Sequence, residues 1–318
     1  MPLTNGMAQT IAQALMPICF CILLGWMAGK TKVMPTEYGR ALARFVVLFA
    51  LPIALFIAAT KANPRDIFDI RTFLALLAGF GLTFVIGWLG ARHLFRHNET
   101  DRAVQALACS FPNISYCGPP VLVAAVGNSA LLMVVTGNLV AALVIVPIAL
   151  VVMARNAKHE AKKVSFVGAV ARALRQPLLL LPVAGALFAV AGIGLPPLAV
   201  TSAKEIGVAA GGTALFALGL ILSEAPLRLD REIIFNVLVK NVIQPSVILA
   251  VGYALGLRGA NLAQAFLLGV LPTAAEVSAI AVARNAYAEK VAGSTTASVL
   301  ASIVTISVGV AIARFLQS

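Results

Sequence analysis

Two short segments interrupt long apolar stretches of the chain with residues that suit the binding of an anion. The first segment carries Pro112, Asn113, Ser115, Gly118 and Pro120. Each proline removes a backbone donor and costs a helix about 3 kcal/mol, so we expect the helix to be broken there. The broken ends leave free N–H groups at the positive pole of a helix dipole, an arrangement that binds a carboxylate or phosphate.

A matching interruption lies in the second half of the chain. It contains Pro272 and Thr273, followed one turn later by Glu276. We expect Asn113 to contact the bound anion; the alternative is a side chain that only caps the broken backbone. Glu276 suggests proton coupling, because a carboxyl group inside a membrane protein is able to carry a proton; a structural ion pair with Lys240 is an equal alternative.

Lys240 lies about nine residues inside a predicted membrane span, where a charge costs about 2.5–3.5 kcal/mol. We expect it to bind a substrate carboxylate or to pair with Glu276, with snorkelling to the interface as the alternative. Asn138, Gln105 and Gln264 either line the path or form interhelical hydrogen bonds. The candidate binding residues are Pro112, Asn113, Ser115, Tyr116, Gly118, Pro120, Asn138, Lys240, Pro272, Thr273 and Glu276.

The composition indicates which elements position these residues. Of the 318 residues 60% are hydrophobic and 11% are charged, which does not describe a water-facing surface. At about 20 residues a span, the chain holds ten transmembrane helices and little else, so we predict an all-α integral membrane protein. The predicted spans are 9–29, 39–60, 72–91, 102–126, 130–153, 170–192, 198–222, 232–256, 261–286 and 293–315. Residues 165–176 are expected to form an interfacial helix that leads into the sixth span.

The 24 Lys and Arg residues predict how the chain is oriented. With ten spans both termini lie on one side, which holds six basic residues; the other side holds 17, and Lys240 lies inside a span. Cytoplasmic loops carry the excess of basic residues, so we expect a multi-pass protein of the inner membrane with both termini outside the cytoplasm. The first eight residues carry no Lys or Arg, so we expect no cleavable signal.

Several less common residues recur at a separation of 160 positions, which indicates an internal repeat. The pairs are Pro17 with Pro177, Gly25 with Gly185, Phe56 with Phe216, and Pro112 with Pro272. Each half, 1–157 and 158–318, contains five predicted spans. Because five is odd, the second half enters the membrane from the opposite face, and its broken helix is expected to cross that of the first half at the midplane. Such inverted repeats suit alternating access.

Other classes of protein fit the sequence less well. All three histidines, His93, His97 and His159, fall in connectors, and no zinc-protease motif or phosphate-binding P-loop is present, so we expect neither an enzyme nor a cofactor. The four cysteines lie in apolar stretches and show no disulfide or metal spacing. The basic residues are scattered through short connectors, so we do not expect nucleic acid as a partner.

The run Asn113-Ile-Ser-Tyr-Cys-Gly-Pro-Pro resembles the N-x-x-aromatic-x-G-x-P signature of the auxin efflux carrier family. Bacterial members of that family resemble permeases for malonate, malate and similar acids. Residues 279–287 and 295–302 are similar to the family's last two spans, and residues 41–56 to its second. The resemblance implies ten spans in two inverted halves, with spans 1, 2, 6 and 7 as a scaffold and spans 3–5 and 8–10 as the moving unit.

From these observations we predict a secondary carrier that moves small organic anions, such as mono- or dicarboxylates, by alternating access. An anion channel or a membrane receptor for a carboxylate ligand is the alternative. The expected partners are the anion, the lipid bilayer and a second copy in a homodimer. The coupling ion is H⁺ or Na⁺, and the sequence leaves the choice open.

Overall fold

The computed structural model describes residues 2–61, 69–155, 165–224 and 229–317. Within these residues the chain is all-helical, and its single strand-type bridge joins Pro112 to Thr273. The first half contains α1 (Pro2–Lys30), α2 (Thr36–Phe45), η1 (Val46–Ala50), α3 (Leu51–Thr60), α4 (Ile70–His93), α5 (Glu99–Ser110), α6 (Gly118–Val126), η2 (Asn128–Ala130), α7 (Leu131–Val140), η3 (Ala141–Ile145) and α8 (Val146–Arg155). The second half contains α9 (Phe166–Leu174), α10 (Pro177–Val190), α11 (Pro197–Leu222), α12 (Arg231–Leu238), η4 (Val239–Ile243), α13 (Gln244–Ala254), α14 (Gly259–Val270), α15 (Ala275–Ala283) and α16 (Ala288–Gln317).

Six continuous helices among the described residues are long and apolar enough to cross a membrane: 36–60, 70–93, 128–154, 197–222, 231–254 and 288–317. α9 and α10 make a seventh if the 64° bend between them lies within one span. The predicted spans 102–126 and 261–286 are not counted, because each is divided into two short halves. The predicted span 9–29 is not counted either, because its apolar helix Met16–Lys30 is shorter than the others. The all-α membrane fold is thus confirmed, whereas length and composition support six or seven spans where the sequence predicts ten.

Prolines inside the long helices follow a common pattern. A single π-helical turn precedes each of three prolines: η1 before Pro52, η3 before Pro147 and η4 before Pro245. Proline lacks an N–H and its ring clashes with the carbonyl four residues earlier, so a wider turn lets the helix continue. Pro112 and Pro272 differ from these, because the helix ends before each of them.

Side-chain caps fix where several helices begin at the ends of the predicted spans. Asp69 accepts a hydrogen bond from the Arg71 N–H, and Asn98 accepts from Thr100 and Asp101. Such caps satisfy backbone donors that lack a helical partner.

Asp230 caps α12 by accepting from the N–H groups of Glu232 and Ile233. It also accepts a hydrogen bond from Lys290, which lowers the pKa of the Asp230 carboxyl below its usual value. This contact ties the beginning of α12 to the first turn of α16.

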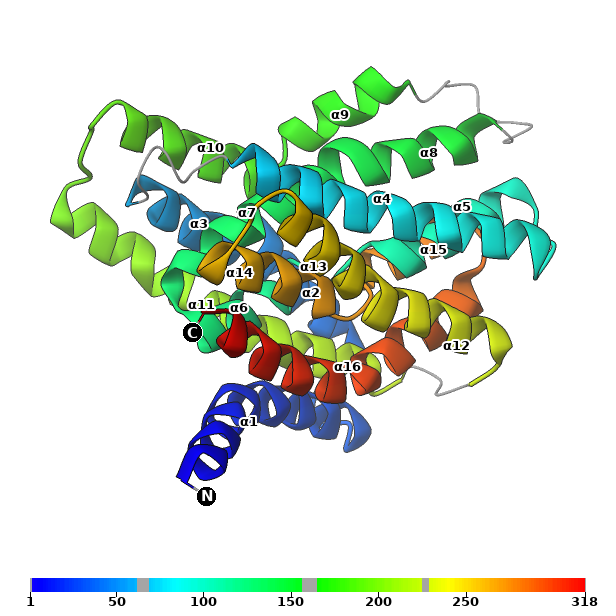
Figure 1. Cartoon of the computed structure of the whole chain (residues 1–318), viewed down its shortest axis with the longest axis horizontal. Helices are drawn as coiled ribbons and strands as arrows, with labels where there is room; N and C mark the ends of the chain where they lie inside the picture. Colours follow the sequence, from blue (N-terminus) through cyan, green and yellow to red (C-terminus); the bar gives the residue numbers. More distant parts are fainter. Residues whose placement is uncertain (1, 62–68, 156–164, 225–228, 318) are drawn as a thin grey trace.

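The helices pack in two groups (Figure 1). In the first group α1 packs against α11, α11 against α2 and α3, and α3 against α10. In the second group α4 packs against α5, α13 and α14, while α16 packs against α12, α14 and α15. In the view of Figure 1, α1 begins and α16 ends in the left half, and the connectors from α4 to α5 and from α15 to α16 lie on the right.

Two glycines allow close approaches within the first group. A Cβ added to Gly25 of α1 would lie 2.1 Å from the carbonyl oxygen of Phe216 in α11. A Cβ added to Gly185 of α10 would lie 2.5 Å from the carbonyl oxygen of Phe56 in α3. The residues of these two contacts are those that recur at a separation of 160 in the sequence, exchanged between the halves.

The substitution Gly25→Ala is expected to lower the stability of the protein, because the new methyl group collides with backbone of α11. Overpacking of this kind costs about 1–3 kcal/mol, and the apparent unfolding temperature in detergent measures the loss. Gly81→Ala is the matched control, because a Cβ at Gly81 in α4 meets no atom within 4 Å. Equal unfolding temperatures of the two variants would contradict the close packing of α1 on α11.

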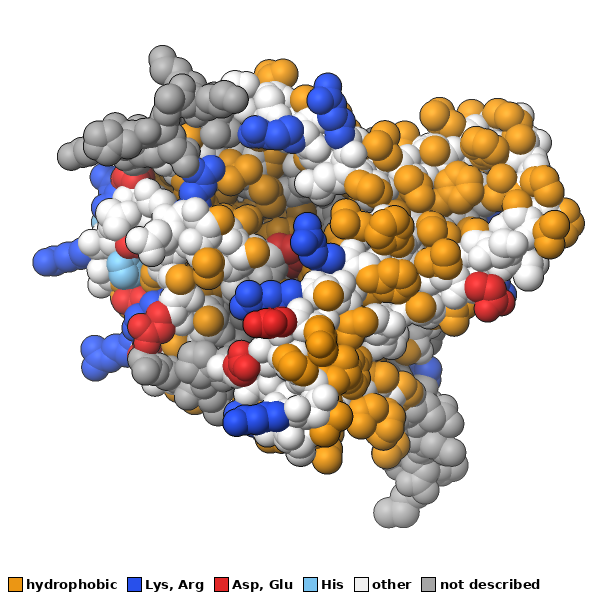
Figure 2. All heavy atoms as spheres, turned by 180° about the vertical axis from the view of Figure 1, so that it is seen from behind, with side chains coloured by type: hydrophobic (Ala, Val, Ile, Leu, Met, Phe, Trp, Pro, Cys, Tyr) orange, Lys and Arg blue, Asp and Glu red, His pale blue; other side chains and the backbone are white. Residues whose placement is uncertain are grey.

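The surface is apolar over much of its area, as a lipid-facing protein requires. Large hydrophobic side chains are exposed on α1, α4, α10, α11 and α16. In the view of Figure 2, Lys and Arg side chains lie mainly over the left and centre, and the right half is largely hydrophobic. Exposed apolar surface on this scale marks contact with another apolar phase, and the hydropathy of the helices identifies that phase as the bilayer.

Candidate functional site

The two interrupted helices meet, and their backbones are hydrogen-bonded to each other. The Asn113 N–H donates to the Pro272 carbonyl at 2.8 Å, and the Ala274 N–H donates to the Phe111 carbonyl at 2.9 Å. These bonds form the short antiparallel bridge between Pro112 and Thr273. The prediction that both helices are broken and lie together is therefore confirmed. The crossing, as we call residues 111–117 and 271–274, is buried in protein, as broken backbone in a membrane must be.

Side chains of neighbouring helices satisfy the carbonyl groups at the end of α5. The Thr273 hydroxyl donates to the Ala108 carbonyl at 3.0 Å. The Gln244 amide donates to the Ser110 carbonyl at 2.6 Å and to the Thr83 hydroxyl at 3.0 Å. The last carbonyls of any helix lack a helical partner, so these bonds allow α5 to end inside the protein. Thr273 is thus a structural contact at the crossing in this conformation.

Lys240 has a role that the sequence does not predict. Its Nζ donates to the carbonyls of Gly269 and Leu271, at 3.0 and 2.5 Å, and the residue is 0% exposed. Snorkelling to the interface is therefore wrong, because the amine points to the end of α14 inside the protein. The predicted pair with Glu276 is also not formed, since no ion pair of Lys240 occurs among the described residues.

Asn113 is completely buried at the first turn of the segment that leads into α6. Its Oδ1 accepts a hydrogen bond from the Tyr116 N–H at 3.3 Å, so the side chain does cap broken backbone. Its Nδ2, however, is buried without a hydrogen-bond partner among the described residues. A buried amide donor without a partner costs about 1–3 kcal/mol, so the Nδ2 of Asn113 is available to a substrate group while its Oδ1 caps the backbone.

Glu276 lies at the first turn of α15, opposite the Asn113 segment. Its carboxylate accepts a hydrogen bond from Ser115, and its Oε2 is buried without a partner among the described residues. Tyr116 and Cys117 are the nearest titratable groups on the facing segment. The crossing therefore brings together Asn113, Ser115, Tyr116 and Glu276, four of the residues that the sequence selects.

The remaining polar candidates lie elsewhere. The Asn138 amide donates to the Val134 carbonyl of its own helix at 3.0 Å. The Gln105 amide donates to Asn236 at 2.9 Å, which is the interhelical bond that the sequence offers as an alternative. Asn236 in turn donates to Ser294 and to the Tyr287 hydroxyl, so α5, α12 and α16 are linked by one buried network.

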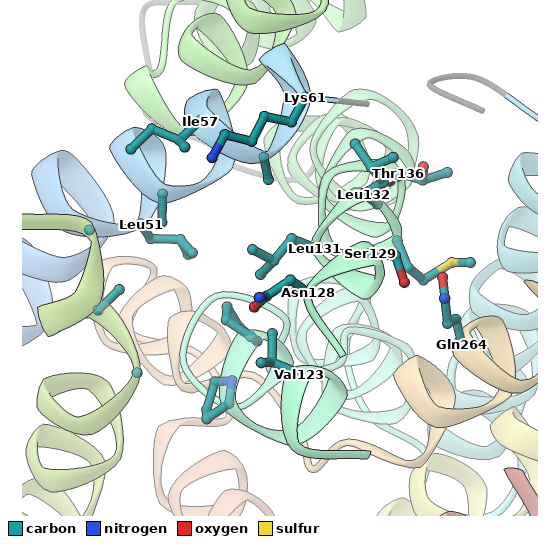
Figure 3. Close-up of a pocket in the computed structure, with 18 of the residues that line it drawn as sticks. Leu51, Ile57, Lys61, Val123, Asn128, Ser129, Leu131, Leu132, Thr136 and Gln264 are labelled. Carbon is teal, nitrogen blue, oxygen red and sulfur yellow. Dashed lines mark hydrogen bonds between the residues drawn. The ribbon is translucent and has the colours of Figure 1, made fainter. Parts of the chain in front are cut away.

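A cavity of about 1170 Å³ lies between the two groups of helices. α3 and α11 supply one wall, α6 and α7 supply the other, and the ends of α4 and α14 complete it. In Figure 3, Leu51, Ile57 and Lys61 lie on one side, Val123, Asn128 and Leu131 on the other, and Gln264 on α14. The volume is at the upper end of ligand pockets, which hold about 300–1,000 Å³, so the cavity is a vestibule that accommodates a small solute with its water.

The vestibule reaches Pro119 and Pro120 in the first turn of α6, which follows directly after the crossing. Pro120 and Gln264 are therefore the predicted candidates that line it. Pro112, Asn113, Ser115, Tyr116, Gly118, Pro272, Thr273, Glu276, Lys240 and Asn138 are not among its lining residues. Asn113 is completely buried and does not line the vestibule, so an anion in the vestibule reaches Asn113 only after a change of conformation.

The rim of the vestibule is cationic, a feature that residue-by-residue reading of the sequence misses. Lys61 at the end of α3, Arg71 in α4 and Lys204 in α11 line it. Asp69 is the one acidic residue among the described lining residues, and its carboxylate already accepts from the Arg71 N–H and the Thr72 hydroxyl. The three cations are half of the six basic residues that the sequence assigns to the side of the termini. Because basic residues are scarce on that side, these few positions are the signal that the sequence offers for the rim.

The sequence matches a known protein family over most of its length. A family model described as a membrane transport protein matches residues 10–310. The chain belongs to this family. The match confirms the resemblance to the auxin efflux carriers that the residues around Asn113 indicate. The transporter therefore acts in a membrane, as its apolar surface requires.

Two relatives are similar to the transporter along nearly their whole length. One is the "Uncharacterized transporter YfdV" of Escherichia coli strain K12, 30% identical over 306 residues, which are 95% of this chain and 98% of that protein. Another is the "Putative malonate transporter" of Rhizobium meliloti strain 1021, 28% identical over 323 residues, which are 93% of this chain and 94% of that protein. Both names describe transporters rather than enzymes.

Proposed function

We propose that this protein is a secondary carrier of small organic anions, with mono- or dicarboxylates such as malonate or malate as substrates. The observation that carries the proposal is the crossing of two broken helices beside a vestibule with a cationic rim. Broken half-helices in carriers direct their N-termini at anionic substrate groups. The name of the Rhizobium meliloti relative includes malonate, which agrees with a small dicarboxylate.

The carrier is proposed to consist of two inverted repeats of five spans, residues 1–157 and 158–318. Contacts that are exchanged between the halves support this symmetry. Gly25 approaches the Phe216 carbonyl just as Gly185 approaches the Phe56 carbonyl. A two-fold axis in the membrane plane produces such reciprocal pairs.

Alternating access follows from the two groups of helices. The first group corresponds to the predicted scaffold spans 1, 2, 6 and 7, and the second to the predicted moving spans 3, 4 and 8–10. Walls of the vestibule come from both groups, so rocking one group against the other closes it and opens a path on the other side. The proposal places the protein in the inner membrane with both termini outside the cytoplasm, where the vestibule then opens. The homodimer predicted from the sequence remains part of the proposal.

A transport assay with the purified protein in liposomes tests this function. We expect saturable uptake of labelled malonate or malate, faster than uptake of a monocarboxylate, and acceleration when unlabelled acid is preloaded inside. Acceleration by preloaded acid distinguishes a carrier from the alternative, an anion channel, because a channel has no site that must return. Binding without any uptake would favour the other alternative, a membrane receptor for a carboxylate, and contradict the proposal.

Neutralising the rim is expected to weaken capture of the substrate. In a variant with Lys61→Gln, Arg71→Gln and Lys204→Gln, the KM for a dicarboxylate should rise by about 3- to 30-fold and depend less on ionic strength, because exposed charges steer anions and are screened by salt. Maximal uptake should change little. Arg314→Gln is the matched control, since Arg314 is an exposed cation near the end of α16 that does not line the vestibule. An unchanged KM in the triple variant would remove the rim from substrate capture.

A further inference from the structure

The end of α14 at the crossing is a position where a transporter of this architecture holds a cation. A helix C-terminus carries a partial negative charge of about half an elementary charge, and its last carbonyls lack helical partners. In carriers with broken helices, unwound carbonyls and half-helix C-terminal ends coordinate the coupling Na⁺ or H⁺. α14 ends at Val270, and the carbonyls of Gly269 and Leu271 lie at this position.

The amine of Lys240 fills that position. Its Nζ donates to both carbonyls, at 3.0 and 2.5 Å, and the side chain is completely buried. No carboxylate pairs with it among the described residues, so the carbonyl dipoles are its partners. A soluble cation at the same carbonyls would have to displace the amine.

The equivalent end of α5 shows that satisfying the carbonyls does not by itself require a charge. There the neutral amide of Gln244 donates to the Ser110 carbonyl. Gln244 and Lys240 both come from the helix formed by α12, η4 and α13, one turn apart. A glutamine would therefore meet the hydrogen-bonding need at position 240 as well, and the ammonium group must serve a different purpose.

Tight packing leaves little room beside the amine. A Cβ on Gly269 would lie 2.7 Å from the Cδ1 of Ile248 and 3.0 Å from the Cα of Pro245, so α13 and α14 are in close contact at this end. The close contact of α13 with α14 limits the space for a soluble cation at this end. The cation held at α14 is thus part of the chain.

We propose that Lys240 is a tethered cation that replaces a soluble coupling cation at the end of α14, so that transport needs no Na⁺. The inference rests on the proposed function for its consequence on coupling. The claim that the end of α14 requires a positive charge rests on the contacts of Lys240 alone. The two parts are tested separately.

The transport part is tested with wild-type protein in liposomes. Uptake of labelled malonate should agree within about twofold whether Na⁺ or N-methylglucamine is the external cation, because no Na⁺ is carried. Uptake that stops without Na⁺ would overturn the inference and leave the proposed function standing. If no acid is transported at all, the proposed function fails, and the stability measurements below decide the inference.

The charge requirement is tested with Lys240→Gln, which keeps a donor for the carbonyls and removes the charge. It should lower uptake by about tenfold or more, with a folded protein by size-exclusion chromatography. Gln244→Ala is the matched control, because it removes a neutral donor at the other break. Wild-type uptake by Lys240→Gln would overturn the inference.

Stability provides a readout that is independent of transport. Lys240→Ala should lower the apparent unfolding temperature by about 5 °C, because two buried carbonyls lose their donor. Methylammonium chloride should recover part of that loss relative to N-methylglucamine chloride, since the small cation fits the vacated space. Wild type and Gln244→Ala should not respond to methylammonium. Equal unfolding temperatures of Lys240→Ala in the two salts would overturn the inference.

Discussion

Replacing Asn113 by aspartate is expected to lower uptake by about 100-fold or more while the protein remains folded. Aspartate keeps the oxygen that accepts the Tyr116 N–H and therefore keeps the cap. It loses the buried Nδ2, which has no partner among the described residues and which we assign to a substrate carboxylate. It also adds a negative charge to a site for an anion. A hydrogen bond to a charged group contributes about 1.5–3 kcal/mol, and the repulsion adds to that loss.

Two further variants separate the binding role of Asn113 from its structural role. Asn113→Ala removes both the cap and the donor, so it should lower uptake as much and also reduce stability by about 1 kcal/mol. Asn138→Ala is the matched control, because Asn138 is also buried and its amide already donates to the Val134 carbonyl of its own helix. It should keep most of the uptake. Wild-type uptake by folded Asn113→Asp would remove Asn113 from the binding site.

Replacing Glu276 by glutamine is expected to abolish the acceleration of uptake by an acidic external pH. Glu276 lies across the crossing from Asn113, with Ser115 as its hydrogen-bond donor. The carboxylate of Glu276 and a substrate carboxylate bound at Asn113 repel each other when both are ionised. We therefore expect the substrate anion to bind when Glu276 carries a proton. Glutamine keeps the size of the side chain and holds no exchangeable charge. Uptake by Glu276→Gln should therefore be the same with and without a pH gradient.

The measurement compares initial uptake in liposomes at equal internal pH and two external pH values, for wild type and Glu276→Gln. Lys290→Gln is a control outside the crossing, since its carboxylate partner is Asp230 at the start of α12. That variant should retain the dependence of the wild type. A proton gradient that still accelerates Glu276→Gln would assign the coupling to another group.

Much of the fold follows from the sequence because lipid imposes simple demands. Apolar runs of about 20 residues predict the long helices, and the interruptions at Pro112 and Pro272 predict where two of them break. The repeat of Gly25 with Gly185 and Phe56 with Phe216 becomes meaningful only in three dimensions, where each glycine meets the other half's phenylalanine carbonyl. Helix lengths support six or seven continuous spans where the sequence predicts ten, and two of the predicted spans consist of two short halves.

The site is predicted in part. Prolines and glycine indicate a break from local chemistry alone, so the sequence correctly identifies the segment around Asn113 as the place where the helix is broken. The partner of each polar side chain depends on tertiary contacts. Lys240 therefore could not be assigned to the carbonyls of Gly269 and Leu271 without the structure. The same holds for the cationic rim, whose three members are far apart in the sequence and meet only around the vestibule.

The most direct test of the account is a structure of the transporter bound to the acid that it takes up fastest. The account predicts that a carboxylate of the acid lies within hydrogen-bonding distance of the Asn113 Nδ2, beside the first turn of α6, with both helices at the crossing still broken. An acid bound only among Lys61, Arg71 and Lys204, with the Asn113 amide still without a partner, would contradict it.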